Sequence, residues 1–163
     1  MPIPNHGRGA TRSPGAGQDD AMASAESEVR ALLDSRSEAV WTKDIDRLMS
    51  FYSPDIVYFD IVPGLQYTGS AALRPRFLEW FDGFKGSIGQ EIRDLHISAS
   101  GDVAVAYMLI RASGALKNGH EVGYWVRATS AFKRSNHRWL VTHEHVSVPV
   151  DFESGSAVTD LVP

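Results

Sequence analysis

The chain contains no cysteine, so it has no disulfide, no thiol nucleophile and no thiolate metal site. It also lacks an apolar run approaching the ~18 residues that a membrane-spanning helix needs. Basic residues are not in excess, since 16 Lys and Arg stand against 20 Asp and Glu, for a formal charge of −4. These absences argue against a membrane partner and against a nucleic-acid partner.

The length of 163 residues predicts a single domain with a sizeable core. Residues 1–24 are rich in proline and glycine and poor in large apolar side chains, which predicts a disordered tail. This tail lacks the apolar core of a signal peptide, and we expect a cytoplasmic protein. The folded domain should span residues 25–152, and residues 153–163 should form a C-terminal tail.

Three helices are expected in the first half of the chain. Residues 25–42 carry an apolar stripe at helical spacing, made of Val29, Leu32, Leu33, Arg36, Val40 and Trp41. Asp44 stands where an N-cap belongs for a short second helix. Pro54 should break the chain before a short strand over residues 56–60. Ser70 should cap a third helix with an aromatic stripe of Phe77, Trp80, Phe81 and Phe84.

The second half of the chain has the period of two that is typical of strands, expected at about 89–98, 102–115, 120–134 and 138–149. Asn118-Gly119 is a strong hairpin signal. This order predicts an α+β fold in which a curved antiparallel sheet carries three helices on its concave face. Three helices cannot cover both faces of such a sheet, so we expect a homodimer through the outer face.

The last long strand, W-L-V-T-H-E-H-V-S, carries three ionisable side chains in a row. Strict alternation places Trp139, Val141 and the two histidines on one face, and Glu144 and Val146 on the other. His143 and His145 have a workable spacing for metal chelation, but no second cluster supplies a third ligand. We therefore expect interface or core histidines rather than a metal site, and no cofactor.

Four short sequence segments, together with this order of helices and strands, resemble those of a known family. They are Val57-Tyr-Phe-Asp60 before a Pro-Gly turn, Tyr67-Thr-Gly69, Trp125-Val-Arg-Ala-Thr129 and Trp139 to Ser147. Together with the order of elements, residues 25–152 resemble the SnoaL-like branch of the nuclear transport factor 2-like superfamily, close to ketosteroid isomerase homologues. The resemblance implies a cone-shaped pocket between the concave sheet and the helices, usually within a dimer.

The resemblance also implies roles for single residues. Asp60 matches the position of the isomerase general base, which removes a proton next to a carbonyl group. The isomerase's oxyanion-stabilising groups do not carry over, because Arg36 stands in place of its tyrosine and Ala128 in place of its protonated aspartate. Steroid isomerisation by that mechanism is therefore not expected, although Arg36 still offers a positive charge to an anion.

The same comparison predicts the composition of the pocket. Leu109, Arg111, Ala128, Glu144 and Val146 should face it from the sheet, unless a bulge reverses part of a strand. We expect Arg111 and Glu144 to form a buried ion pair and to leave Asp60 as the unpaired carboxylate. Further contacts to a ligand are expected from Tyr58, Arg36, Phe77 and Trp80.

Two classes of function follow from this pocket. The first is a protein that binds a small, largely apolar organic molecule and acts as a cofactor-free isomerase, cyclase or dehydratase. In that case Asp60 is the general base, and Arg111 and Glu144 assist it. The second is a non-catalytic ligand-binding or dimerisation module, in which Asp60 caps the end of a strand. Fold alone does not separate the two.

Overall fold

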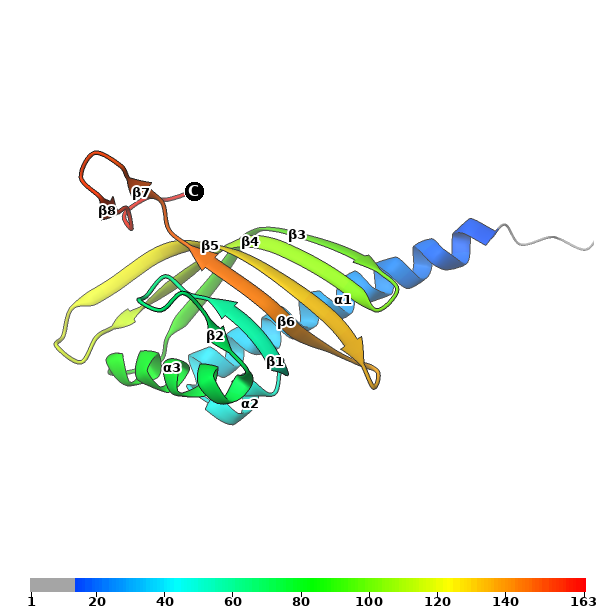
Figure 1. Ribbon diagram of the computed structural model, residues 1–163, viewed down its shortest axis with the longest axis horizontal. Helices are drawn as coiled ribbons and strands as arrows, with labels where there is room; N and C mark the ends of the chain where they lie inside the picture. The colour runs from blue at the N-terminus through cyan, green and yellow to red at the C-terminus, as the bar shows by residue number, and fades with distance from the viewer. Residues whose placement is uncertain (1–13) are drawn as a thin grey trace, which may run out of the picture.

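The computed structural model describes residues 14–163 as three helices and a curved sheet (Figure 1). The helices are α1 (Pro14–Trp41), α2 (Ile45–Met49) and α3 (Ser70–Gly83). The strands are β1 (Tyr52–Phe59), β2 (Tyr67–Thr68), β3 (Gly89–Ser100), β4 (Val103–Ala115), β5 (Glu121–Ser135), β6 (Arg138–Ser147), β7 (Val150–Asp151) and β8 (Ser156–Ala157). No described helix has the length and apolar character needed to cross a membrane.

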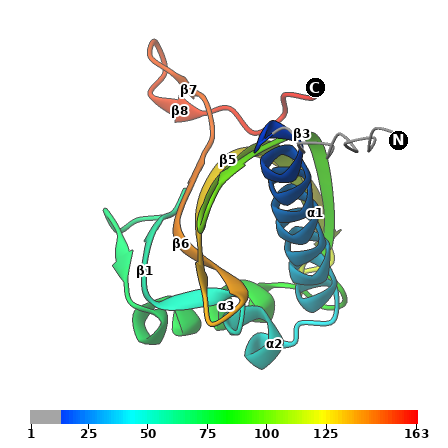
Figure 2. The same cartoon turned by 90° about the vertical axis from the view of Figure 1, so that its right-hand side faces the viewer.

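The main sheet has the order β2-β1-β6-β5-β4-β3. The strands β3 to β6 form an antiparallel meander, whereas β1 pairs with β6 in parallel and so joins the early part of the chain to its last long strand. The sheet curves strongly, and α1 lies in its hollow (Figure 2). The predicted α+β fold, with the helices on the concave face, is confirmed.

The first helix begins earlier than the sequence predicted. Residues 14–24, which we assigned to a disordered tail, form the first turns of α1, and residues 1–13 lie outside the described residues. Alanine and methionine in this stretch favour helix, so it continues the packed part of α1. It projects beyond the sheet in Figure 1, and Ala25 is the first buried residue among those of α1 whose side chains the structure describes.

The start of α2 agrees with the prediction, whereas the starts of α3 and β1 differ from it. Asp44 caps α2 as expected, accepting a hydrogen bond from the Arg47 N–H at 3.0 Å. Ser70 does not cap α3, because Gly69 is its N-cap residue, at φ +84°, without a side-chain bond. The strand β1 also runs through Pro54, which lies in an irregular part of its pairing with β6, where the missing N–H removes no ladder bond.

A bulge in β6 reverses the alternation that we predicted. Ala131 pairs with His143 whereas Phe132 pairs with Val141, so Thr142 is an extra residue in the strand. Trp139 and Val141 are therefore buried in the core, not on the outer face beside the histidines as predicted. Beyond the bulge the original alternation holds, and Glu144 remains inside while His143 and His145 lie on the opposite face.

The chain ends in a small hairpin of β7 and β8, which stands away from the main sheet in Figures 1 and 2. Val150 pairs with Ala157, so the segment 153–163 that we predicted to be a tail contains one strand of this hairpin. Phe152 at its turn is 97% exposed.

Candidate functional site

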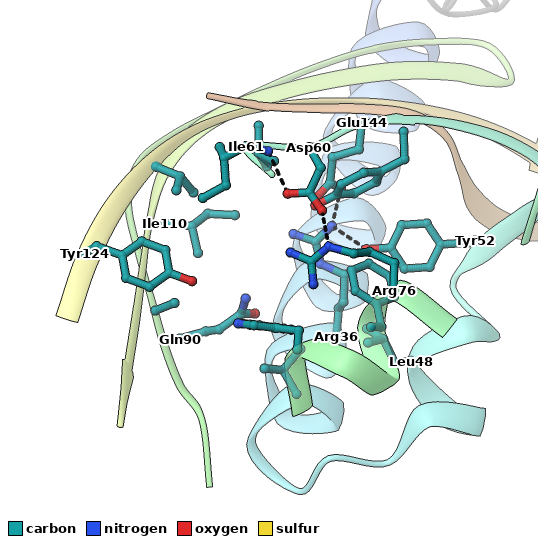
Figure 3. Close-up of a pocket in the computed structure, with 17 residues that line it drawn as sticks. Arg36, Leu48, Tyr52, Asp60, Ile61, Arg76, Gln90, Ile110, Tyr124 and Glu144 are labelled. Carbon is teal, nitrogen blue, oxygen red and sulfur yellow. Dashed lines mark hydrogen bonds and ion pairs between the residues drawn. The ribbon is translucent and has the colours of Figure 1, made fainter. Parts of the chain in front are cut away.

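A cavity lies between the concave sheet face and the helices (Figure 3). Its volume is about 80 Å³. The lining residues are Arg36, Val40, Leu48, Tyr52, Tyr58, Asp60, Ile61, Arg76, Phe77, Trp80, Gln90, Ile110, Ala112, Tyr124, Val126, Glu144 and Val146. The cavity is thus built by the helices α1, α2 and α3 and the strands β1, β3, β4, β5 and β6, with Asp60 and Ile61 following β1.

Asp60 reaches the cavity from the end of β1. It stands two residues after the buried Tyr58, so both side chains point to the inner face. The Asp60 side chain is only 6% exposed. Its Oδ1 accepts a hydrogen bond from the Ile61 N–H at 2.7 Å, and its Oδ2 lies 2.8 Å from Arg76 Nε.

Arg76 comes from α3 and is the partner of Asp60. Its side chain is 13% exposed, so the two opposite charges meet largely out of water. The Nε atom has no hydrogen bond to a described residue despite its short distance to Asp60, because the N–H is not directed at the carboxylate oxygen. The contact is an ion pair whose donor remains free to bond elsewhere. Asp60 is thus not the unpaired carboxylate that we predicted.

A second ion pair is buried deeper in the cavity. Arg36 of α1 donates a hydrogen bond to Glu144 of β6, and both side chains are almost fully buried. Ser130 donates to the same carboxylate oxygen at 3.0 Å, and Arg36 also reaches the Tyr52 hydroxyl at 3.5 Å. Burial alone would lower the pKa of Arg36, but Glu144 and the two tyrosines nearby raise it above its ordinary value, so the guanidinium stays charged.

Three tyrosines add hydroxyl groups to the lining. Burial raises the pKa of Tyr58 well above its ordinary value, and the nearby Glu144 carboxylate raises it further. Burial also raises the pKa of Tyr52 and of Tyr124. All three phenols are therefore neutral near pH 7, and each retains an O–H that can donate to a ligand.

Most of the predicted pocket residues line this cavity. They are Arg36, Tyr58, Asp60, Phe77, Trp80, Glu144 and Val146. Ala128 is buried on the same face of the sheet but does not reach the cavity. The structure brings these residues together without assigning roles to them.

Leu109 and Arg111 lie on the other face of the sheet, and our prediction for them is wrong. The inward positions of β4 are the buried Ala104, Ala106, Met108, Ile110 and Ala112, which places Leu109 and Arg111 on the outer face. Arg111 instead lies across Gly123, where an added Cβ would come within 2.5 Å of its guanidinium. The predicted Arg111–Glu144 ion pair therefore does not form, and Arg36 takes the place of Arg111.

Sequence reasoning missed four polar lining residues, Arg76, Tyr52, Gln90 and Tyr124. A signal for Arg76 was present, because it stands four residues before Trp80 and so shares the face of α3 that carries the aromatic stripe. The histidines lie elsewhere: His143 Nδ1 is 2.8 Å from the Val57 carbonyl oxygen, and Phe59 packs edge-on against both His143 and His145. Within residues 14–163 no group of three side chains is arranged to hold a metal ion.

The chemistry available in the cavity is proton transfer and hydrogen bonding. It offers two carboxylates, two guanidinium groups, neutral phenols and the Trp80 and Gln90 side chains around an apolar floor. A cavity enclosed by a curved sheet and three helices defines a cone-shaped α+β fold.

The comparisons with known proteins identify the family. Residues 29–151 match the SnoaL-like domain, so the chain belongs to the SnoaL-like family of the NTF2-like superfamily. A comparison with curated proteins gave no match.

Solved structures agree with this assignment. An NTF2-like protein of unknown function from Pseudomonas putida KT2440 shares 33% identity and a TM-score of 0.79, over 87% of this chain and 99% of that one. A candidate dehydratase of the NTF2-like family from Streptomyces avermitilis shares 18% identity and a TM-score of 0.69, over 77% and 96% of the two chains. The association domain of C. elegans CaMKII shares 16% identity and a TM-score of 0.65, over 78% and 98%. The last two likenesses show the fold alone.

Proposed function

We propose that the protein binds a small organic molecule in the cone cavity and catalyses proton transfer on it without a cofactor, as an isomerase, cyclase or dehydratase does. The observation that carries this proposal is the position of Asp60, a carboxylate that lines the cavity with a side chain only 6% exposed. Sites that exclude water in this way let a carboxylate remove a proton next to a carbonyl group.

The groups around Asp60 suit this role. Arg76 holds one carboxylate oxygen and the Ile61 N–H the other, so the base is oriented before a substrate arrives. Arg76 is also the nearest positive charge to any oxyanion that forms beside Asp60. The neutral hydroxyls of Tyr58 and Tyr124 supply protons or hydrogen bonds on the other sides of the cavity.

The size of the cavity limits the substrate. A volume of about 80 Å³ corresponds to roughly five to eight water molecules. Typical sites for drug-sized ligands are about 300–1,000 Å³. The proposed substrate is therefore a compact molecule, far smaller than a steroid. The candidate dehydratase from Streptomyces avermitilis has the same fold, which is compatible with elimination chemistry here but gives no substrate.

A second function is favoured by a different observation. Both oxygens of Asp60 are already engaged, one by a backbone N–H and one by Arg76, as expected for a carboxylate that stabilises the end of β1. In that case the protein is a non-catalytic binding module with the same cavity. The two functions differ in whether a bound ligand exchanges its protons.

Exchange of ligand protons with deuterium from the solvent distinguishes the two functions. We would incubate butan-2-one and 3-hydroxybutan-2-one in D₂O with the protein and follow loss of the proton next to the carbonyl by NMR. The wild-type protein should accelerate exchange, and Asp60→Asn should abolish the acceleration while ligand binding, followed by chemical-shift changes, persists.

The matched control is Asp46→Asn, because the Asp46 carboxylate is 84% exposed, pairs with Arg74 and does not line the cavity. This variant should exchange protons at the wild-type rate. Exchange by Asp60→Asn at the wild-type rate would remove Asp60 as the base. Binding without exchange in the wild-type protein would favour the non-catalytic module.

We also propose that the protein is a homodimer through the outer face of the sheet. This face of β4 exposes three large side chains in succession, Val103, Val105 and Tyr107, which are 56%, 41% and 54% exposed. A monomer rarely exposes so many large apolar side chains side by side. Trp125 and the His96–Tyr107 stack continue this surface on β5 and β3. The association domain of C. elegans CaMKII has the same fold, and its name describes association in that protein.

A further inference from the structure

Three buried polar atoms in the cavity lack a hydrogen-bond partner among the described residues. They are Arg76 Nε, Trp80 Nε1 and Gln90 Oε1. Trp80 Nε1 lies near enough to the Tyr124 hydroxyl to offset part of the rise that burial causes in the pKa of that phenol, but outside hydrogen-bond geometry. Buried polar groups are rarely left unpaired, because each loses its hydration without a replacement bond. Three in one cavity indicate that a ligand with matching groups completes them.

Two of these atoms are N–H donors on the same helix face. Arg76 and Trp80 are four residues apart on α3, so their side chains are neighbours. The Arg76 N–H is not directed at Asp60 although the two atoms are 2.8 Å apart, so it is available for a third group. Two neighbouring donors suit one acceptor, such as a carbonyl oxygen.

The third atom lies across the cavity on the sheet. Gln90, Ala112 and Tyr124 form one row across β3, β4 and β5, and the small Ala112 leaves space between the two polar side chains. Figure 3 shows Gln90 and Tyr124 on one side of the cavity. The Gln90 amide can present its oxygen or its nitrogen, so it suits a hydroxyl group, which both donates and accepts.

The charges of the lining decide whether the ligand is charged. Arg36 is compensated by Glu144, and Arg76 by Asp60, while the tyrosines are neutral. The lining is therefore balanced without a ligand. A carboxylate would bring an uncompensated negative charge next to Asp60, which the buried site disfavours.

We infer that the natural ligand of the cavity is a compact, uncharged hydroxycarbonyl compound. Its carbonyl oxygen accepts hydrogen bonds from Arg76 and Trp80, and its hydroxyl pairs with Gln90. The inference rests on the proposed function for the site and gives it a geometry: Asp60 lies beside the donors of the carbonyl oxygen, where a proton next to that carbonyl is within its reach. When Asp60 removes this proton, the electron pair moves to the carbonyl oxygen as an enolate, which Arg76 and Trp80 stabilise.

Four small compounds of similar size test the class of ligand. They are 3-hydroxybutan-2-one, butan-2-one without the hydroxyl, butane-2,3-diol without the carbonyl, and lactate, in which a carboxylate replaces the methyl ketone. Dissociation constants from NMR titration at neutral pH should rank the hydroxyketone tightest. The ketone should bind about fivefold more weakly, because it loses the neutral hydrogen bonds of the hydroxyl group. The diol should bind at least tenfold more weakly, because it loses the hydrogen bond to the charged guanidinium of Arg76. Lactate should bind at least tenfold more weakly.

Two variants assign the contacts. Trp80→Phe keeps an aromatic ring but removes the N–H, and it should weaken both ketones without affecting the diol. Gln90→Leu should remove the preference for the hydroxyketone over the ketone. The matched control is Trp41→Phe, at the exposed end of α1, which should leave all four constants unchanged.

The outcomes separate this inference from the proposed function. Lactate binding as tightly as the hydroxyketone would overturn the uncharged class, even if exchange still depends on Asp60. Equal binding of all four compounds would overturn the assigned donors. The predicted ranking without proton exchange would support this inference and reject catalysis.

Discussion

The guanidinium of Arg36 and the carboxylate of Glu144 meet in the interior of the domain although 108 positions separate them in the chain. Their side chains are only 3% and 4% exposed. The pair connects α1 to β6 across the cavity, and the Ser130 hydroxyl donates a further hydrogen bond to the Glu144 carboxylate. Each charge depends on the other for its burial.

Replacing one member of this pair should lower the free energy of unfolding more than replacing both. Arg36→Met leaves Glu144 buried without a counter-charge and should lower the free energy of unfolding by about 3–5 kcal/mol, measured in urea. Arg36→Met combined with Glu144→Gln should recover part of that loss. The control is Arg47→Met, whose exposed pair with Glu38 should contribute less than about 1 kcal/mol. An Arg36→Met effect as small as the control's would contradict the buried pairing.

The buried tyrosines predict a loss of stability in alkali. Folding raises the pKa of Tyr52 and Tyr58 above the ordinary value of 10.0, so unfolded tyrosines release protons that the folded ones keep. The contribution is fully present below pH 10 and is lost as the pH rises above it, by up to about 1.4 kcal/mol per pH unit for each tyrosine. Urea unfolding at several pH values should show this fall.

The double variant Tyr52→Phe/Tyr58→Phe should flatten the pH dependence above pH 10, whatever its stability at pH 7. Tyr67→Phe is the control, because Tyr67 lies on β2 and does not line the cavity. It should retain the wild-type slope. A double variant with an unchanged slope would show that other groups govern alkaline unfolding.

The bulge in β6 changes the expected effect of a charge at Val141. The side chain is fully buried, so Val141→Asp should unfold the domain instead of separating two subunits. Circular dichroism should show that this variant is already unfolded at room temperature, with no cooperative melting transition on heating. A folded, monomeric Val141→Asp protein would indicate that Val141 is at an interface.

The proposed dimer is tested on β4. Tyr107→Glu places a charge in the middle of the exposed apolar strand face and should shift the molecular mass measured by light scattering from dimer to monomer. The far-ultraviolet circular dichroism should be unchanged. A wild-type protein that is monomeric at micromolar concentration would refute the dimer.

The N-terminal segment should be dispensable for stability. Residues 14–24 are helical, but Ala25 is the first buried residue among those of α1 whose side chains the structure describes. A protein that begins at Ser24 should keep its melting temperature within about two degrees, as expected when little apolar surface is lost. A larger loss would show that the segment packs against the domain.

The sequence predicted the fold because its periodicity and turns were unambiguous, but it predicted the faces of the strands unevenly. In β5, Val126, Ala128 and Ser130 face inward as expected. In β4 both alternating sets are apolar, from Val103 to Ile110, so hydrophobicity alone does not tell which set is buried. We chose the wrong set there.

The candidate site shows the same limit. Arg36 stands within the apolar stripe of the first helix, which indicated burial but not its partner. Glu144 was expected inside and is inside, yet the bulge at Thr142 was not visible in the sequence. Ion pairs between distant segments follow from tertiary packing, which local patterns do not encode.

The parallel pairing of β1 with β6 has a consequence for the order of folding. The meander β3 to β6 forms from segments that are neighbours in the chain. The strand β1 instead pairs with β6, which begins 79 positions later, since Phe59 ends β1 and Arg138 begins β6. Closing so long a loop is entropically slow. The native ladder on β1 should therefore appear last in pulse-labelled hydrogen exchange, and Asp60 reaches its place beside Arg76 only at that final step.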